Sequence, residues 1–215
     1  MKLAEDLLVA AKSGEDTSAF VAALADVDPA ALTPPERLAF WLDVYNARVK
    51  TATVGMSGDL RTKRGFFKDT AYVVGGRRIS LHEMEHGVLR GNRRPPYSPF
   101  RPLGGGDPRL AWIVELDPRI HFALNCGAHS CPPIRAYTAE RIDPQLTLAT
   151  RAYLDGEVVV TGQTLTLPYL CSLYANDFAD VRAFVAAHLD DTRAEWIRKN
   201  PRAKVTYGAY RWEIV

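Results

Sequence analysis

The sequence predicts an α+β fold, in which N-terminal helices pack on an antiparallel sheet built from hairpins. Apolar residues repeat at helical spacing through the first 55 positions. Two later segments, residues 71–79 and 158–167, instead carry short β-type runs on either side of a turn. Helices that come first and hairpins that follow are typical of an α+β domain.

Length and composition fit one globular domain, with residues 1–32 as an N-terminal helical extension and residues 33–215 as the core. Hydrophobic residues make up 47% and charged residues 24% of the chain, which argues against disorder and coiled coil. A formal net charge of +2 is too balanced for a protein that neutralises many nucleic-acid phosphates. We therefore expect no nucleic-acid partner.

Three features predict a cytoplasmic protein with no membrane partner. No apolar run approaches the roughly 18 residues that span a bilayer, and no export signal is visible. The cysteines, Cys126, Cys131 and Cys171, are too few and odd in number for a secreted disulfide framework.

No glycine-rich segment matches a P-loop or a dinucleotide fingerprint, so we expect no cofactor.

The strongest helix signal begins at residues 33–36, Thr-Pro-Pro-Glu. This is a capping box with proline at the first helical positions, where a missing N–H is tolerated. Apolar residues then recur at helical spacing as far as Val49, and Gly55 offers a stop. Two shorter helices are expected before it, around residues 3–11 and 17–24.

From residue 71 the pattern changes to a tight hairpin, followed by a second capped helix. Residues 71–74 and 77–79 flank a Gly-Gly turn. Residues 80–83, Ser-Leu-His-Glu, form another capping box, which predicts a helix of about three turns as far as Arg90. Residues 91–108 are rich in glycine, proline and arginine, and so long a loop is a candidate cover for a substrate.

The second half of the chain begins with a predicted buried strand at residues 119–124, which runs into a cysteine-containing turn at residues 125–133. A hairpin is expected at residues 158–167, where β-type runs flank a glycine. The remaining expected elements are helices at residues 143–154, 178–189 and 191–199 and strands at residues 204–207 and 211–215.

Residues 82–86, His-Glu-Met-Glu-His, match the H-E-x-x-H pattern in which two histidines on one helix face bind zinc and the glutamate activates water. Glu83, however, already completes a capping box, and the helix begins only two residues before His82. No third-ligand extension follows. A zinc-dependent hydrolase that uses His82, Glu83 and His86 is therefore a lesser alternative, and we expect no metal.

The turn after residue 124 is the second candidate for chemistry. Cys126 ends a predicted buried strand in a glycine turn, where a nucleophile would lie beside free backbone N–H groups. Its thiol needs an imidazole nearby, for which His86 and His121 are candidates. Cys126 could equally be a small buried hydrophobe, or could form a disulfide or redox pair with Cys131.

Two further polar groups occur in apolar surroundings. Asn46 lies on the central helix, where it would either orient an active-site group or tie a loop to the helix. Arg119 and His121 alternate with apolar residues and would share one face of the predicted strand.

Four blocks carry a resemblance to a known family: residues 40–47, FWLDVYNA; residues 79–90, ISLHEMEHGVLR; residues 117–133, DPRIHFALNCGAHSCPP; and residues 174–178, YANDF. They resemble the family catalogued as domain of unknown function 547, over roughly residues 35–180. The resemblance implies that His86, His121, Cys126 and Cys131 belong to one site, and the family's pattern includes Glu85 beside His86. It also implies that histidine is not characteristic at position 82. The family name records no function.

A weaker fold analogy is to the papain and transglutaminase arrangement, in which a buried helix precedes an antiparallel sheet. Those enzymes carry the nucleophilic cysteine at the start of that helix, whereas residues 38–46 contain none. A thiol site in this chain would therefore use the turn at residues 125–133.

We accordingly expect a thiol-dependent hydrolase or acyl transferase that acts on a small-molecule or peptide substrate at an amide bond. The alternative is a non-catalytic ligand- or protein-binding domain with structural or redox cysteines. Cys126 is the expected nucleophile with Cys131 as the second choice, and His86 is the expected base with His121 as the second choice. Glu85 would balance charge, and the turn amides would hold the oxyanion. The expected substrate-binding residues are Arg119, Asn46, Asn125 and Arg90.

Overall fold

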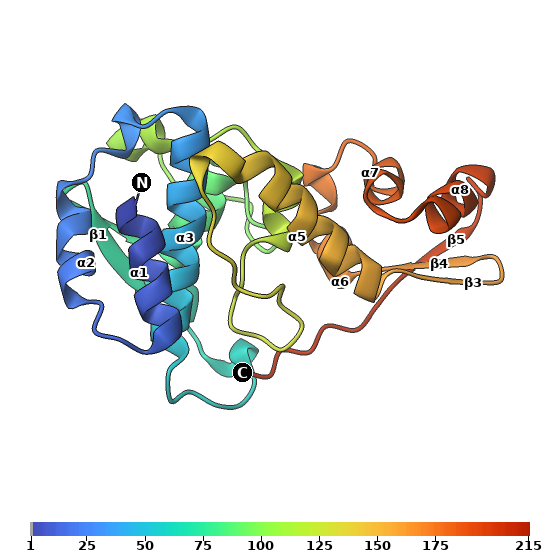
Figure 1. Ribbon diagram of the computed structural model, residues 1–215, viewed down its shortest axis with the longest axis horizontal. Coiled ribbons are helices and arrows are strands. Elements are labelled where there is room, and N and C mark those ends of the chain that lie inside the picture. The colour runs from blue at the N-terminus through green and yellow to red at the C-terminus, as the bar shows by residue number, and fades with distance from the viewer. Residues whose placement is uncertain (1) are drawn as a thin grey trace.

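A computed structural model describes residues 2–215 and has the predicted α+β fold (Figure 1). The helices are α1 (Lys2–Ser13), α2 (Ser18–Ala23), α3 (Pro34–Thr53), α4 (Phe66–Asp69), α5 (Ile142–Glu157), α6 (Tyr169–Leu173), α7 (Val181–His188) and α8 (Asp191–Lys199). The strands are β1 (Ala71–Val74), β2 (Arg77–Ser80), β3 (Val159–Thr161), β4 (Thr164–Leu167) and β5 (Lys204–Tyr207).

Helix α3 is the centre of the larger core. Its predicted capping box is present, because the Thr33 N–H donates to Glu36 Oε2 at 2.9 Å. Its middle is buried around nearly the whole circumference, and α1 packs along it (Figure 1). Buried polar residues on this helix, Tyr45 and Asn46, therefore face protein on every side and must find hydrogen-bond partners there. The division of the chain at residue 33 stays a prediction.

The strands form two small sheets at opposite ends of the molecule (Figure 1). The predicted hairpins are present as the antiparallel pairs β1–β2 and β3–β4. The expectation of purely antiparallel pairing was wrong for β5, which lies parallel to β4. Helices α6, α7 and α8 intervene, so the chain returns to the start of β4 and runs in the same direction.

Residues 119–124 do not form the predicted strand. A 3-10 helix, Pro118–Phe122, is present instead, and Asp117 caps it by accepting the Arg119 N–H at 2.9 Å. An aspartate followed by proline starts a helical turn, and this local chemistry outweighs the alternating pattern. Arg119 and His121 therefore do not share a strand face.

The second capped helix begins as predicted, with the Ser80 N–H donating to Glu83 Oε2 at 2.9 Å. It continues as a π-helix, Glu83–Leu89, rather than an α-helix, and the chain leaves it at Gly91 with a φ of 63°. π-helical turns are frequent at functional sites. This turn brings Glu85 and His86 to the same cavity.

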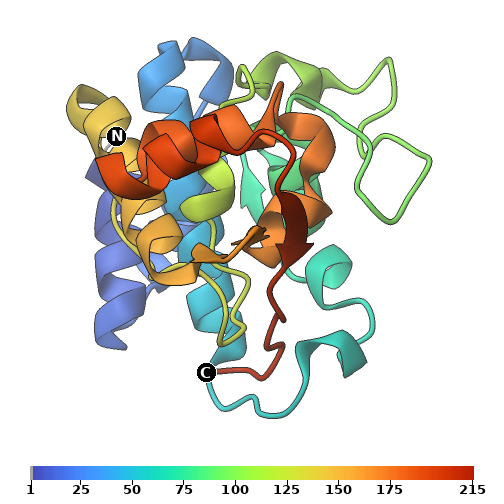
Figure 2. The same cartoon turned by 90° about the vertical axis from the view of Figure 1, so that its right-hand side faces the viewer.

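The C-terminal segment returns across the molecule after β5 and ends near the loop that follows α3 (Figure 2). The strand predicted at residues 211–215 is reduced to two isolated bridges, Asp59 with Glu213 and Ala128 with Ile214. These bridges hold the segment against the cysteine turn. Tyr210 and Trp212 reach the cavity in this way.

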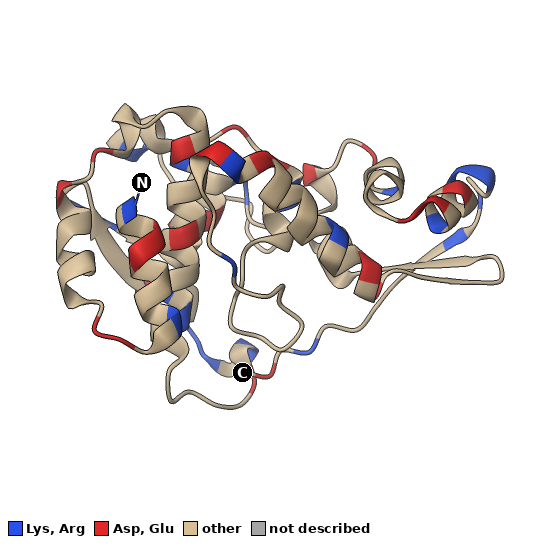
Figure 3. Cartoon of the chain, viewed as in Figure 1, with Lys and Arg blue, Asp and Glu red and all other residues tan. Residues whose placement is uncertain are grey.

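Basic and acidic residues are interspersed over the chain, in keeping with the formal net charge of +2 (Figure 3). Within residues 2–215, no helix combines the length and apolar character needed to cross a bilayer. The cytoplasmic location stays a prediction.

Candidate active site

A cavity of about 630 Å³ lies where α3, the π-helix, the cysteine turn, α6 and the C-terminal segment meet. Five of the predicted catalytic residues line it: Glu85, His86, His121, Cys126 and Cys131. Close-packed interiors rarely leave a void of this size, and ligand pockets commonly have it. The cavity is therefore the candidate site.

The two cysteines form a single contacting pair. Their Sγ atoms lie 2.7 Å apart, and both thiols are free and partly exposed. The Cys126 N–H donates to Cys131 Sγ at 3.0 Å, and the Tyr210 hydroxyl lies 3.1 Å from the same sulfur. Three potential donors thus converge on Cys131, whereas Cys126 Sγ has Tyr210 only at 3.5 Å.

This asymmetry separates the acidities of the two thiols. The hydrogen bond to Cys131, together with burial, raises the pKa of Cys126 well above its ordinary value. Burial also opposes ionisation of Cys131, but hydrogen bonds from Cys126 and Tyr210 outweigh it and lower the pKa of Cys131 to about 7. The hydrogen bonds therefore favour ionisation of Cys131 and leave the proton on Cys126, whereas the sequence favours Cys126 as the nucleophile.

Most backbone amides of the turn are already engaged and are not open to the expected oxyanion. The Cys126 N–H points to a sulfur, and the Gly127 N–H donates to Asn125 Oδ1 at 2.7 Å. Three further amides bond to backbone carbonyls: His129 to Glu213, Ser130 to Arg211, and Cys131 to Ala128. The Ala128 N–H instead lies beside the two sulfurs. The N–H groups of Cys126 and Ala128 favour a thiolate, and the other amides hold the turn in place.

Glu85 is a buried carboxylate that two tyrosines hold. Tyr45 donates its hydroxyl to Oε2 at 3.1 Å, and Tyr174 donates to Oε1 at 2.5 Å. Burial opposes ionisation, but the Tyr174 hydroxyl and the Arg90 guanidinium keep the pKa of Glu85 below its ordinary value. The cavity therefore holds one fixed negative charge, and that charge already has its donors.

The hydrogen bonds of His86 fix its tautomer. A guanidinium only donates, so the contact of 3.0 Å between Arg90 Nη1 and His86 Nδ1 makes Nδ1 the acceptor. Burial lowers the pKa of His86 to about 4, so the ring is neutral and carries its proton on Nε2. That N–H donates to the Tyr97 hydroxyl at 3.0 Å, and Tyr97 donates onward to His82 Nδ1 at 3.0 Å. Neither nitrogen of His86 is free to act as a base.

His121 is arranged differently. Its Nε2 lies 2.9 Å from Asp177 Oδ2, and this carboxylate also accepts from Arg90 at 2.6 and 3.0 Å. Burial alone would raise the pKa of Asp177, but the bonds from His121 and Arg90 keep it far below its ordinary value. His121 therefore carries its proton on Nε2, while burial keeps the ring neutral by lowering its pKa. Within residues 2–215, Nδ1 of His121 has no hydrogen-bond partner, so its lone pair is available.

Tyr174 connects these groups to Glu85. Its ring stacks on His121 with centroids 3.9 Å apart, and the Arg90 guanidinium lies 5.0 Å from the same ring. Because His121 is clamped between Asp177 and this ring, its orientation is fixed.

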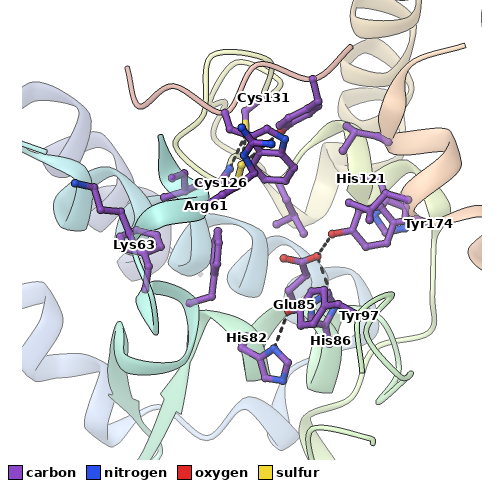
Figure 4. Close-up of a pocket in the computed structure, with 18 of the residues that line it drawn as sticks. Arg61, Lys63, His82, Glu85, His86, Tyr97, His121, Cys126, Cys131 and Tyr174 are labelled. Carbon is purple, nitrogen blue, oxygen red and sulfur yellow. Dashed lines mark hydrogen bonds and ion pairs between the residues drawn. The ribbon is translucent and has the colours of Figure 1, made fainter. Parts of the chain in front are cut away.

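Figure 4 shows the cysteines on one side of the cavity and the histidines on the other. We call Cys126, Cys131 and Tyr210 the sulfur wall, and Glu85, His86, His121 and Tyr174 the imidazole wall. Among the residues that the structure describes, no hydrogen bond joins a sulfur to an imidazole. The two walls would thus meet through a substrate or water.

The four expected substrate-binding residues do not line the cavity. Asn46 donates to the Ala123 carbonyl and accepts from the Asn125 N–H, so it ties the turn to α3. The Asn125 side-chain amide holds Pro132. Arg119 pairs with Asp117 and Asp143, and Arg90 with Asp177. All four position other groups, because their polar atoms are committed within the protein.

The zinc arrangement is not assembled. The Glu83 carboxylate accepts from the Ser80 cap and pairs with Arg109 at 2.9 Å, so it is engaged away from the histidines. The Tyr97 hydroxyl bridges His82 and His86. Across residues 2–215, no three histidine, cysteine, aspartate or glutamate side chains are grouped so as to hold a metal.

Sequence reasoning gave no role to Asp177, Tyr174, Tyr97 or Tyr210. Asp177 and Tyr174 belong to the YANDF block, which contributed to the family resemblance but indicated no role for either residue. Tyr97 lies in the predicted loop at residues 91–108. Through its hydroxyl, this loop contacts the histidines of the site. Nothing local marked Tyr210.

Comparison with known proteins supplies one match. The family model described as "Protein of unknown function, DUF547" matches residues 29–154. No curated protein and no solved structure matches the chain, so the papain analogy has no support. The matched range includes both cysteines and all three cavity histidines, whereas Asp177 and Tyr210 lie beyond it.

Proposed function

Since the chain belongs to the DUF547 family, whose description leaves the activity open, we propose from its site that it is a thiol-dependent hydrolase or acyl transferase acting on a small-molecule or peptide substrate. One observation carries the proposal: Cys131, with its pKa lowered to about 7, lies at the wall of a cavity of about 630 Å³. A thiolate near neutral pH needs no adjacent base in order to attack.

In the first step, Cys131 Sγ attacks the substrate carbonyl carbon, and the bond to the leaving group breaks. The resulting thioester removes the negative charge that raised the pKa of Cys126. Cys126 then becomes acidic enough to give its S–H proton to the leaving group. This step yields an acylated Cys131, a Cys126 thiolate and the protonated leaving group.

In the second step, water or an acceptor nucleophile attacks the thioester. His121 is suited to take the proton, because Nδ1 offers a lone pair and Asp177 stabilises the imidazolium that forms. The Cys131 thiolate leaves, and the proton on His121 passes to Cys126. The site returns to its starting state with one water or acceptor consumed.

A second candidate function follows from the contact of 2.7 Å between the sulfurs. Cys131 could attack a disulfide substrate, and Cys126 could then displace the mixed disulfide. This exchange releases two thiols and leaves a Cys126–Cys131 disulfide, so electrons balance between protein and substrate. The same contact also suits the non-catalytic alternative with structural or redox cysteines.

Intact-mass spectrometry with acyl thioesters and activated esters of varied chain length tests the first proposal. We expect wild type to gain one acyl mass that tryptic peptides locate at Cys131 and that decays in water. Cys131→Ser should abolish the adduct, His121→Gln should slow its decay, and Cys171→Ser should match wild type, because Cys171 is fully buried. The absence of any adduct, or an adduct that Cys131→Ser retains, would refute acyl transfer.

A further inference from the structure

The cavity wall has two chemically distinct parts. Leucine and aromatic side chains form the first part, among them Leu60, Phe66, Phe67, Leu124 and Leu170. Such a lining gains free energy by covering apolar ligand surface, at about 25 cal/mol per Å². An all-polar substrate would leave this surface without a partner.

The other part is a cationic rim, which we define as Lys63, Arg64 and Lys68. All three line the cavity and come from one short stretch of chain around α4. Within residues 2–215 none of them makes an ion pair, whereas the neighbouring Arg61 is paired with Asp59. The rim therefore carries positive charge that no ion pair among the described residues offsets.

No carboxylate on the cavity wall is free to pair with the rim. Glu85 is the only carboxylate among the lining residues, and its oxygens already accept from two tyrosines. Figure 4 shows Lys63 on the side of the cavity away from His121 and Tyr174. A ligand that reaches from the rim to the imidazole wall must therefore cross the apolar lining and pass the sulfur wall.

We infer that the substrate is an anionic amphiphile, with an extended apolar group in the cavity and a carboxylate or phosphate at the cationic rim. This inference rests on the proposed function, because it names the substrate class of the same site. Cations at a cavity mouth attract anions and raise the local concentration of these anions. The apolar group supplies affinity, and the rim selects the sign of the charge.

Binding to Cys131→Ser protein, in which turnover is blocked, tests the inference. Isothermal titration is run with four probes: decanoate, decyl phosphate, decyltrimethylammonium and butyrate. We expect decanoate or decyl phosphate to bind at least roughly tenfold more tightly than the other two, because only these combine charge and chain. The better of the two identifies the anionic group.

Charge reversal supplies the matched control. The triple variant Lys63→Glu, Arg64→Glu, Lys68→Glu should weaken binding of the better anion by roughly tenfold or more. Arg202→Glu, an exposed change outside the cavity, should alter it by less than roughly twofold. Equal binding of the cationic probe, or an unchanged affinity in the triple variant, would overturn the inference.

Failure of the proposed function gives a different result. If Cys131→Ser binds the anionic probe as expected and wild type never forms an acyl adduct with any ester, the site is an anion-selective ligand pocket without acyl chemistry. If wild type is acylated at Cys131 equally well by neutral and anionic esters, the enzyme proposal stands and the substrate class is wrong.

Discussion

Different kinds of interaction stabilise the two walls of the cavity. The sulfur wall depends on hydrogen bonds from backbone amides, Asn125 and Tyr210, within a turn that is partly exposed. The imidazole wall depends on buried charge, because Asp177, Arg90 and Glu85 are ionised with little access to water. Losing a neutral hydrogen bond costs about 1 kcal/mol, whereas leaving a buried charge unpaired costs several. The imidazole wall should therefore control stability, and the sulfur wall reactivity.

The largest effect is expected from Asp177→Ala. This change leaves the Arg90 guanidinium and the His121 N–H without their shared acceptor, so the free energy of unfolding should fall by about 3–5 kcal/mol. Urea unfolding at pH 7 measures it. Asp155→Ala, at an exposed carboxylate paired with Arg193, should cost less than about 1 kcal/mol. Equal losses in the two variants would remove the distinction between the walls.

A pH effect comes next. The pKa of His86 is about 4 in the folded protein and about 6.5 in the unfolded chain, so the unfolded chain takes up the proton first. Stability is therefore complete above about pH 6.5 and falls towards pH 4, by up to about 3 kcal/mol. His86→Gln should flatten this part of the profile. Urea unfolding across this pH range measures both profiles.

The turn that carries the two cysteines contains one glycine at which an added side chain would strain the backbone. Gly127 has a φ of 92°, and a Cβ there would lie 2.8 Å from Thr53 Cγ2. Gly127→Ala should therefore destabilise the protein by about 1–3 kcal/mol, as thermal unfolding would report. Gly104→Ala, which meets nothing within 4 Å, is the control. A melting temperature for Gly127→Ala equal to that of this control would mean that the turn relaxes freely.

The smallest expected effect is the most specific to reactivity. Tyr210→Phe removes one donor from Cys131 Sγ, so the pKa of Cys131 should rise, by an amount that a hydrogen bond of about 1 kcal/mol allows. The pH profile of Cys131 alkylation reports the shift. Tyr207→Phe, at a half-exposed ring on β5, should leave the profile in place. An unshifted profile for Tyr210→Phe would mean that the hydrogen bonds from Cys126, without Tyr210, account for the lowered pKa of Cys131.

Local chemistry allowed much of the fold to be predicted. The capping boxes at residues 33–36 and 80–83 and both hairpin turns depend on side chains a few positions apart, which the sequence displays directly. Residues 119–124 were misassigned because alternation outweighed the capping signal of Asp117. The parallel pairing of β5 depends on how three helices return the chain, and no local pattern encodes that.

The candidate site was only partly predictable for the same reason. Cys126, Cys131, Glu85, His86 and His121 could be nominated by residue type and family resemblance, and all line one cavity. Their roles depend on partners distant in sequence, such as Asp177 for His121 and Tyr210 for Cys131. The relative acidity of the two thiols depends on those contacts, so the sequence alone does not predict it.

The most direct test is the order in which the thiols react with iodoacetamide as the pH is raised, followed for each tryptic peptide by mass spectrometry. We expect Cys131 to be alkylated first, with a midpoint near pH 7, well before Cys126 and Cys171. Alkylation of Cys126 before Cys131, or a Cys131 midpoint at or above about 8.5, the value of a free thiol, would contradict it.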